Sequence, residues 1–143
     1  MSSDALAREA TTLLYRCGQA VDECDWDSFT ACFAPDATFD LPRTGRHEDR
    51  AAMVRAVVGV RSKLRQTQHL ITNPIVTVGE DGIGSSCYVL AQHCRVFDGI
   101  EVQYLFGGRY TDAMRVVGDT VTIAERRLEI LWTQGDPTVL TAA

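Results

Sequence analysis

Three features are scarce or missing in this sequence, and each absence excludes a class of protein. The chain has no run of Lys and Arg residues, and its 14 basic residues are outnumbered by 19 acidic ones. The net charge of -5 is opposite in sign to a surface that binds nucleic acids or anionic membranes. No stretch reaches the roughly 18 apolar residues of a membrane span. We therefore expect no nucleic-acid partner and no membrane association.

Cysteine pairs and metal-binding spacings are also missing. The cysteines, which are Cys17, Cys24, Cys32, Cys87 and Cys94, include no Cys-x-x-Cys pair. We expect reduced, mostly buried thiols rather than a disulfide framework or a zinc site. The histidines show no His-x-His or Glu-x-x-His spacing, so no metal site is expected. Residues 1–18 carry scattered charges and no apolar segment of signal-peptide length, which predicts a cytoplasmic protein.

Helical periodicity dominates the first part of the chain. Apolar residues recur at spacings of three and four between Asp4 and Glu23, which is typical of an amphipathic helix. Asp25 is placed to cap a second, short helix over residues 26–33. Residues 34–42 then predict a turn and a short strand that ends at Pro42, followed by an exposed loop over residues 43–49.

A third helix is predicted over residues 50–64. The apolar residues expected on its inner face are Met53, Val54, Val57, Val58 and Leu64, and the charged residues expected outside are Arg55, Arg61 and Lys63. After this helix the hydrophobic period changes from 3.6 to 2, which indicates that strands follow.

Four long strands fill most of the remaining chain, over residues 67–78, 84–97, 101–116 and 120–132. The short links between them, GEDG, DG and VGD, are turn signals and predict an antiparallel meander. Gly107 and Gly108 indicate a bulge or sharp bend in the third strand. Three helices and a bent sheet give an α+β fold in a single domain, residues 1–143, whose tail from residue 133 is expected to be mobile or to form a lid.

Polar residues interrupt the inward-facing rows of these strands. The rows are Ile71, Asn73 and Ile75 beside His69; Cys87, Val89 and Ala91 beside His93; and Ala124, Leu128, Ile130 and Trp132 beside Arg126. An arginine among apolar neighbours needs an anion from the protein or from a ligand. Each residue alone is compatible with a structural role, as a hydrogen-bonded core histidine or as half of an ion pair.

Asp22 is placed to meet one of these groups. It ends the first helix and shares a flank with Tyr15 and Gly18, at spacings of seven and four. The helix dipole and partial burial both disfavour a bare carboxylate there, so a protonated histidine or Arg126 would be its natural partner. A carboxylate that orients an imidazole is a general-base arrangement, although an aspartate in this position, taken alone, is more often a structural helix-end residue.

Three stretches of the sequence resemble the SnoaL-like branch of the nuclear transport factor 2-like superfamily. They are AVDECDWDSFTACFAPDATFDL, QHLITNPIVTV and GGRYTDAMRVVGDTVTIAERR. The resemblance spans nearly the whole chain. It implies a cone-shaped α+β barrel in which three N-terminal helices pack on a strongly bent, mostly antiparallel sheet and enclose a cavity.

The resemblance also implies catalytic residues. In the scytalone dehydratases and hexachlorocyclohexane dehydrochlorinases of this branch, a helix-end aspartate and a strand histidine remove a proton during an elimination, without a metal or an organic cofactor. These positions fall on Asp22 and His69. A second catalytic histidine of the dehydratases falls on His93, and an arginine of the dehydrochlorinases falls on Arg126.

The implied substrate is a small hydrophobic compound, carbonyl-bearing or polyketide-like. Scytalone itself is not expected, because the tyrosines that polarise its carbonyl fall on Val21 and Leu41. His93 or Tyr110 would hold the developing oxyanion or protonate the leaving group. The residues expected to contact the substrate are Tyr15, Val21, Leu41, Asn73, Val89, Tyr110 and Trp132.

Two function classes follow from these observations. The first is a cofactor-independent lyase, isomerase or cyclase that uses the Asp22–His69 pair. The alternative is a binding or assembly protein that keeps the cavity but performs no chemistry, like the small β-subunits of ring-hydroxylating dioxygenases. In either class we expect a homodimer or homotrimer, because Tyr88, Leu90 and Leu105 fall on the outer face of the sheet and would otherwise be exposed together.

Overall fold

The computed structural model describes all 143 residues and has the predicted order of elements. The helices are α1 (Ser3–Asp22), α2 (Trp26–Ala31), α3 (Arg50–Arg61) and α4 (Thr138–Thr141). The strands are β1 (Phe33–Leu41), β2 (Gly45–His47), β3 (Gln66–Gly79), β4 (Gly82–Phe97), β5 (Ile100–Val117) and β6 (Thr120–Gly135). No helix is long and apolar enough to cross a membrane.

Side-chain caps explain where the first three helices begin. Ser2, Asp25 and Asp49 each accept a hydrogen bond from a backbone N–H in the first turn of α1, α2 and α3, respectively. Such a cap satisfies one of the N–H groups that a helix start leaves without an intrahelical partner. The cap on α2 that the sequence predicts at Asp25 is confirmed.

The six strands form one sheet in the order β2-β1-β6-β5-β4-β3. Strands β3 to β6 form the predicted antiparallel meander, whereas β1 pairs in parallel with β6. The exposed loop predicted over residues 43–49 is wrong in part, because Gly45–His47 pairs with β1 as a short antiparallel strand. The predicted turn before β1 is also absent, since the strand begins at Phe33, two residues after α2 ends.

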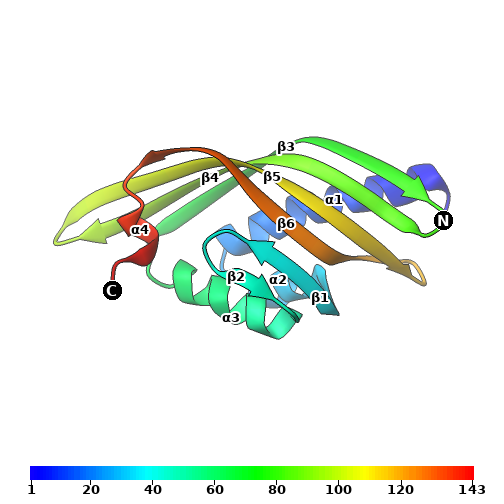
Figure 1. Cartoon of the computed structure of the whole chain (residues 1–143), viewed down its shortest axis with the longest axis horizontal. Helices are drawn as coiled ribbons and strands as arrows, with labels where there is room; N and C mark the ends of the chain where they lie inside the picture. Colours follow the sequence, from blue (N-terminus) through cyan, green and yellow to red (C-terminus); the bar gives the residue numbers. More distant parts are fainter.

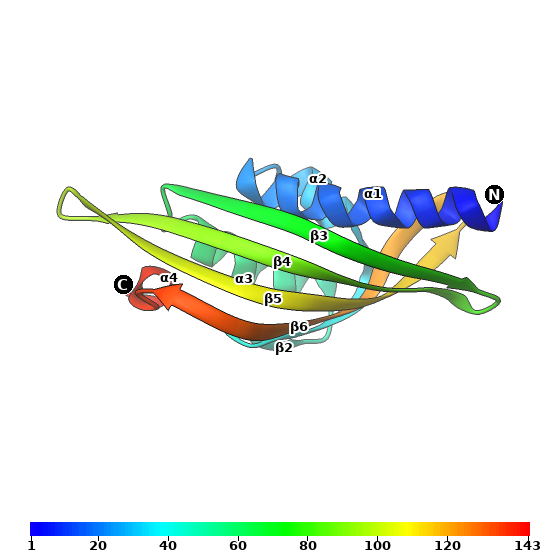
Figure 2. The ribbon, with the colours of Figure 1, turned by 90° about the horizontal axis from the view of Figure 1, so that it is seen from above.

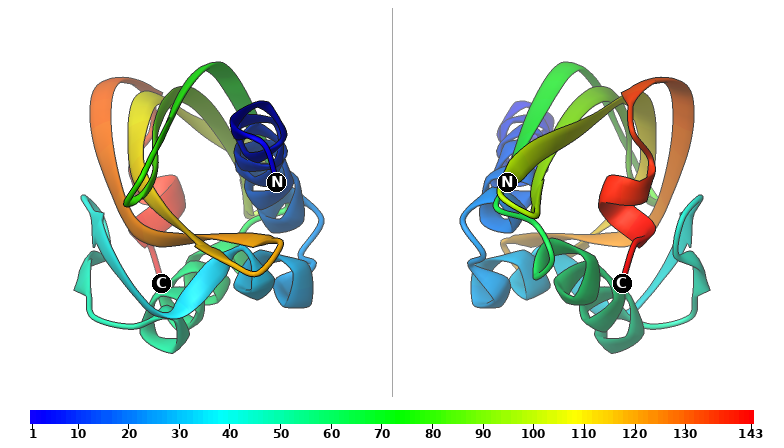
Figure 3. Two further views of the ribbon diagram at one scale, coloured as in Figure 1. Left: turned by 90° about the vertical axis from the view of Figure 1, so that its right-hand side faces the viewer. Right: turned by 90° about the vertical axis from the view of Figure 1, so that its left-hand side faces the viewer.

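Local irregularities curl the sheet (Figures 2 and 3). The predicted bulge at Gly107 and Gly108 is confirmed, because these neighbours pair with Trp132 and Ile130 and leave Leu131 of β6 unpaired. A second shift follows Ala113 on the same strand pair. Each extra residue bends the strand and increases its twist. The sheet therefore curves without closing, and β2 and β3 remain as its edges.

The helices cover the concave side of the curled sheet. Figure 3 shows α1 running beside β3, while α2 and α3 lie near β1. One apolar cluster joins α1 and α2 to β1 and includes Leu14, Phe33 and Met53. A second cluster, with Tyr104 and Phe106 at its centre, lies toward α4. This layered α+β arrangement confirms the fold class inferred from the sequence.

The chain after residue 132 is folded against the body of the protein. Strand β6 continues to Gly135, and α4 follows at the same end of the molecule as the β4–β5 turn (Figure 1). Val139 and Leu140 of α4 are buried in the second apolar cluster. The Arg95 guanidinium donates hydrogen bonds to the backbone carbonyls of Val139 and Ala142, at 3.3 and 2.7 Å. The tail is thus anchored by apolar packing and by one buried arginine.

Apolar side chains gather on the convex face of the sheet. One row crosses the four long strands at paired positions. It consists of Leu70 of β3, Leu90 of β4, Gly107 of β5 and Trp132 of β6. Leu70 and Trp132 are 44% and 47% exposed, and Tyr88 lies exposed beside them. A contiguous apolar row in water favours association with another surface.

We predict that the protein is a homodimer or homotrimer through this row. Light scattering coupled to gel filtration at micromolar concentration should give a dimer or trimer mass. Leu70→Lys should shift the mass toward the monomer, because it places a charge in the apolar contact. Ile100→Lys, which changes an exposed residue in the β4–β5 turn region, should leave the mass unchanged. A parent protein that elutes as a clean monomer would contradict the prediction.

Candidate active site

A cavity of about 210 Å³ lies between the concave face of the sheet and the helices. Of its 24 lining residues 15 are hydrophobic, so the wall is largely apolar. No Asp or Glu lines the cavity, and the lining residues with polar or ionisable side chains are Cys17, Arg43, Thr44, Thr67, His69, His93, Tyr110, Arg126 and Thr141. Its size suits a small organic molecule.

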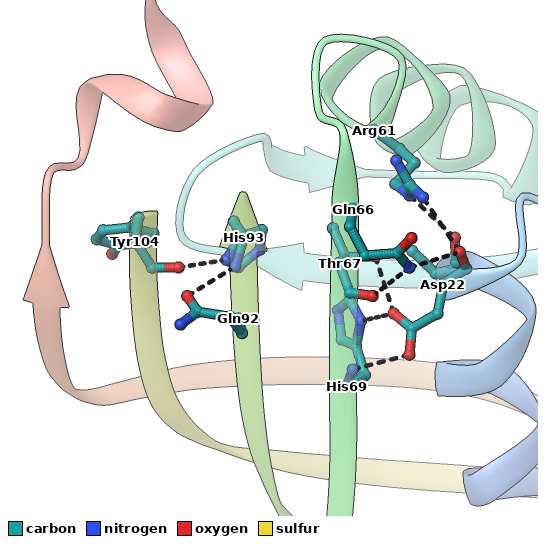
Figure 4. A network of polar contacts seen from close by, with 9 residues as sticks. Asp22, Arg61, Gln66, Thr67, His69, Gln92, His93 and Tyr104 are labelled. Atoms are coloured by element: carbon teal, nitrogen blue, oxygen red, sulfur yellow. Dashed lines mark hydrogen bonds and ion pairs between the residues drawn. The ribbon is translucent and has the colours of Figure 1, made fainter. Parts of the chain in front are cut away.

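Asp22 and His69 are in direct contact at the wall of this cavity (Figure 4). The Asp22 Oδ1 atom lies 2.7 Å from Nδ1 of His69. Asp22 Oδ2 accepts a hydrogen bond from the backbone N–H of His69 at 2.8 Å, and Oδ1 accepts another from the Thr67 hydroxyl at 2.8 Å. The carboxylate is thus fixed from three directions by one strand.

The close approach of α1 to β3 makes this contact possible. Gly18 lies one turn before Asp22 on α1, and a Cβ atom at Gly18 would sit 3.2 Å from Cβ of His69 and 3.3 Å from the Ile71 side chain. Any larger residue would push the helix away from the strand. Because residues four apart share a helix face, Asp22 then lies directly over the residues around His69.

The hydrogen bonds determine the protonation of both groups. Burial would raise the pKa of Asp22, but the bonds from the His69 side chain, the His69 backbone and Thr67 outweigh burial and lower it below its usual value. The ionised carboxylate can only accept, so Nδ1 of His69 carries the proton. The Nε2 atom of His69 is left with a free lone pair, as a general base requires.

A buried arginine supports the helix end that carries Asp22. The Arg61 guanidinium donates to the backbone carbonyls of Val21, Asp22 and Leu64, at 3.3, 3.1 and 3.1 Å (Figure 4). These contacts place a cation at the negative end of the α1 dipole and satisfy carbonyls that the helix leaves open. The predicted outward position of Arg61 is wrong, and the residue instead locks α1, α3 and the start of β3 together.

His93 faces the same cavity from the next strand. Its ring centroid lies 6.1 Å from that of His69, and its Nδ1 atom donates to the backbone carbonyl of Tyr104 at 3.0 Å. Burial lowers the pKa of His93 to about 4, although the hydrogen bond to the Tyr104 carbonyl opposes this effect, and the positive charge of Arg43 adds to it. His93 is therefore neutral at physiological pH, and its Nε2 atom is a hydrogen-bond acceptor rather than a donor.

Arg126 lines the cavity but is engaged by a partner from the protein. Its Nε and Nη2 atoms bond both oxygens of Asp112 at 2.8 and 2.9 Å, and both side chains are buried. The guanidinium also stacks 3.8 Å from the centroid of the Tyr110 ring. The sequence indicated that Arg126 needs an anion but did not identify it. In the structure that anion is Asp112, so the ion pair carries no net charge.

Three of the predicted substrate contacts line the cavity, namely Val21, Leu41 and Tyr110. Burial raises the pKa of Tyr110 to about 12 despite the opposing charge of Arg126, so its hydroxyl stays protonated and can donate. Val89 is fully buried in the second apolar cluster and does not reach the cavity surface.

The other three predicted contacts face away from the cavity. Asn73 has a φ of +53° at a shift in the β3–β4 register, which turns it outward and leaves Ile75 69% exposed. The extra residue Leu131 turns Trp132 onto Gly107 of the convex face. Tyr15 is exposed on α1, because β3 is an edge strand and nothing beyond it covers that flank.

Two residues that contact the candidate site residues, Thr67 and Asp112, were not identified from the sequence. Thr67 lies two residues before His69, so strand alternation already placed it on the same face. Asp112 lies opposite Arg126 only because the β5–β6 register shifts by one residue after Ala113. If the register is counted from the β5–β6 turn without that shift, Asp112 lies opposite a different residue.

The described residues contain no group of three or more His, Cys, Asp or Glu that could hold a metal ion.

The pKa of His93 generates a prediction about stability. The unfolded chain binds a proton on this histidine near pH 6.5, whereas the folded protein binds it only near pH 4. As the pH falls, the unfolded state therefore binds this proton before the folded state does. The free energy of unfolding should decrease by about 3 kcal/mol between pH 6.5 and pH 4. Urea unfolding at pH 7, 5.5 and 4 should show a flatter pH dependence for His93→Gln than for the parent. Parallel curves would contradict the assignment of a neutral, buried His93.

The Arg126–Asp112 pair generates a second prediction. Asp112→Asn keeps the shape but leaves a buried, uncompensated guanidinium, and it should reduce the free energy of unfolding by about 3–5 kcal/mol. The double variant Arg126→Met with Asp112→Leu should recover most of this loss, since it removes both charges. Denaturant unfolding of the two variants tests this. A single variant within about 1 kcal/mol of the parent would show that the pair is not a structural ion pair.

Comparison with solved structures shows the same fold in several proteins. A candidate aromatic ring hydroxylase from Novosphingobium aromaticivorans superposes with a TM-score of 0.85 over 99% of this chain and 100% of its own, at 20% identity. A candidate scytalone dehydratase from the same organism gives a TM-score of 0.79, with 89% and 85% coverage and 20% identity. Hexachlorocyclohexane dehydrochlorinase LinA-type3 from Novosphingobium barchaimii gives 0.78, with 91% and 89% coverage and 14% identity.

At these identities the similarity establishes the fold alone. No curated protein matches the sequence. The family model described as the SnoaL-like domain matches residues 5–127, which include most of α1, strands β1 to β5 and the Asp22–His69 pair. The resemblance found in the sequence is therefore confirmed, and the chain belongs to the SnoaL-like domain family.

Proposed function

We propose that the protein is a cofactor-independent lyase or isomerase that acts on a small hydrophobic, carbonyl-bearing substrate. The observation that carries this proposal is the Asp22–His69 contact, with Nε2 of His69 left unpaired in an apolar cavity. A neutral imidazole oriented by a carboxylate is suited to remove a proton at neutral pH. A histidine that served packing alone would not need an ionised partner.

In the proposed reaction, Nε2 of His69 removes a proton from a carbon next to the substrate carbonyl. The electron pair of the broken C–H bond moves toward the carbonyl oxygen, and Asp22 stabilises the imidazolium that forms. The enolate then either expels a leaving group from the neighbouring carbon or takes a proton at another carbon. The first outcome is elimination and the second is isomerisation. General-base catalysis of this kind contributes about 10²- to 10⁴-fold in rate.

The proposed oxyanion donor is Tyr110 rather than His93. Tyr110 keeps its phenolic proton and lines the cavity, whereas the Nδ1 proton of His93 is committed to the Tyr104 carbonyl. A donor aimed at the developing negative charge stabilises the transition state more than the ground state. In this scheme His93 accepts a hydrogen bond from a substrate hydroxyl through Nε2 and orients it.

The comparisons support the reaction class. Two of the similar structures are named for eliminations, a dehydration in one case and a dehydrochlorination in the other. This chain belongs to the SnoaL-like domain family, and the residues proposed here supply a base without further components.

We predict that the protein exchanges the acidic C–H protons of a small hydrophobic ketone, which tests the base step without knowledge of the leaving group. With 2-tetralone in D₂O, NMR should show deuterium uptake that is catalysed by the parent. His69→Ala should lower this rate by about 100-fold or more. Asp22→Asn should lower the rate far more than the affinity for the ketone, because it removes the charge that stabilises the imidazolium. The rate should also fall at acid pH, because a protonated imidazole cannot act as a base.

His47→Ala is the matched control, because this third histidine lies in β2, hydrogen-bonds the Thr44 hydroxyl and does not itself line the cavity. It should exchange protons at the parent rate. The melting temperature of His69→Ala should stay within a few degrees of the parent, so that lost activity is not lost folding. If His69→Ala exchanges protons as fast as the parent, the enzyme proposal fails and the binding or assembly alternative takes its place.

A further inference from the structure

Arg43 is the one cationic side chain of the cavity wall that has no carboxylate partner. His69 is held by Asp22, His93 is neutral, and Arg126 is neutralised by Asp112. No Asp or Glu lines the cavity, and Arg43 forms no ion pair with any residue of the chain. Arg43 is exposed to solvent where it borders the largely apolar cavity wall, so an anion there would be held by the geometry of its hydrogen bonds as well as by charge.

The Arg43 side chain is exposed, but its guanidinium rests on Tyr104. Its Nη2 atom donates a hydrogen bond to the Tyr104 hydroxyl, and its guanidinium carbon lies 4.7 Å from the centroid of the Tyr104 ring. Tyr104 is buried in the second apolar cluster and so gives a fixed support. The guanidinium has five N–H donors, and Tyr104 takes one of them. The remaining donors are available to a ligand.

Tyr104 also ties Arg43 to the catalytic end of the cavity. The Tyr104 hydroxyl accepts from Arg43, and the Tyr104 backbone carbonyl accepts from Nδ1 of His93. The positive charge of Arg43 is close enough to contribute to the low pKa of His93. An anion at Arg43 would therefore lie on the His93 side of the cavity, and the apolar part of the ligand would extend along the hydrophobic wall.

We propose that Arg43 binds a carboxylate of the substrate, so that the substrate is a small apolar acid that also bears the reactive carbonyl. The planar guanidinium fork matches a carboxylate through two parallel hydrogen bonds. A phosphate fits less well, because its greater charge needs several donors and this cavity offers a single unpaired arginine. The substrate class rests on the function proposed above, but the anion site itself can be tested without catalysis.

The test measures the affinity of two matched probes by isothermal titration calorimetry. Cinnamate and cinnamamide have the same apolar body, and only the first is an anion. The parent should bind cinnamate about tenfold or more tightly than cinnamamide, as expected for a charged hydrogen bond. Arg43→Met should abolish this preference while leaving the affinity for cinnamamide unchanged. Arg43→Lys should retain part of the preference, since it keeps the charge and loses the fork.

Arg46→Met is the matched control, because Arg46 follows on the adjacent strand β2, is 56% exposed and pairs with Glu48. It should keep the parent preference for the acid. Equal parent affinities for the two probes, failure of the parent to bind cinnamate at millimolar concentration, or an unchanged preference in Arg43→Met would each overturn the proposal.

His69→Ala separates this proposal from the proposed function. It should keep the preference for cinnamate within a few-fold, because His69 does not contact Arg43, even though it should lose proton exchange. If Arg43→Met loses the preference while His69→Ala exchanges protons normally, the anion site stands and the enzyme proposal falls. If the reverse is found, the base stands and Arg43 has no role in binding an acid.

Discussion

The contact between α1 and β3 at Gly18 is the constraint on which the site depends. The missing side chain lets the helix approach the strand so closely that Asp22, one turn later, reaches both the backbone and the ring of His69. The carboxylate then joins two elements that are 47 residues apart in the sequence. Arg61 reinforces the same joint from α3 by bonding the last carbonyls of α1. Because three elements meet there, the geometry of the pair does not rely on a flexible loop.

The remaining charges are arranged so that the cavity stays largely apolar. Arg126 and Asp112 cancel each other behind the wall, and burial keeps His93 and Tyr110 in their neutral forms. Electrostatic interactions inside such a space are weakly screened, so each remaining charge has a large effect. This arrangement gives distinct roles to groups that look alike in sequence. The two histidines face the same cavity, yet only His69 has an ionised partner that can stabilise an imidazolium.

Hydrophobic periodicity was sufficient to predict most of the elements and to place Asp22 and His69 toward the cavity, because both depend on which face a residue occupies, whereas the pairing of the two residues came from the family resemblance. It failed where a strand gains one residue, since a single insertion reverses every later side chain. For this reason Asn73 and Trp132 face away from the cavity, contrary to the prediction. A shift of the same kind places Asp112 opposite Arg126. Arg61 is a different case. Its spacing of four from Val57 and seven from Val54 placed it on the inner face of α3, and its charge alone suggested the surface.

Burying the polar side chains of Arg61, His93 and Asp22 costs free energy of folding, which suggests that they serve a purpose other than stability. A buried guanidinium bonded only to carbonyls, a histidine kept neutral by burial and a carboxylate beneath a helix end each lose hydration that apolar residues would not lose. A passive cavity could be lined by leucine and valine with less penalty. The hydrogen bonds offset the loss only because each group is held in one orientation by named partners. Such fixed orientation is of little use for stability alone, but it is what a base needs in order to meet a substrate proton.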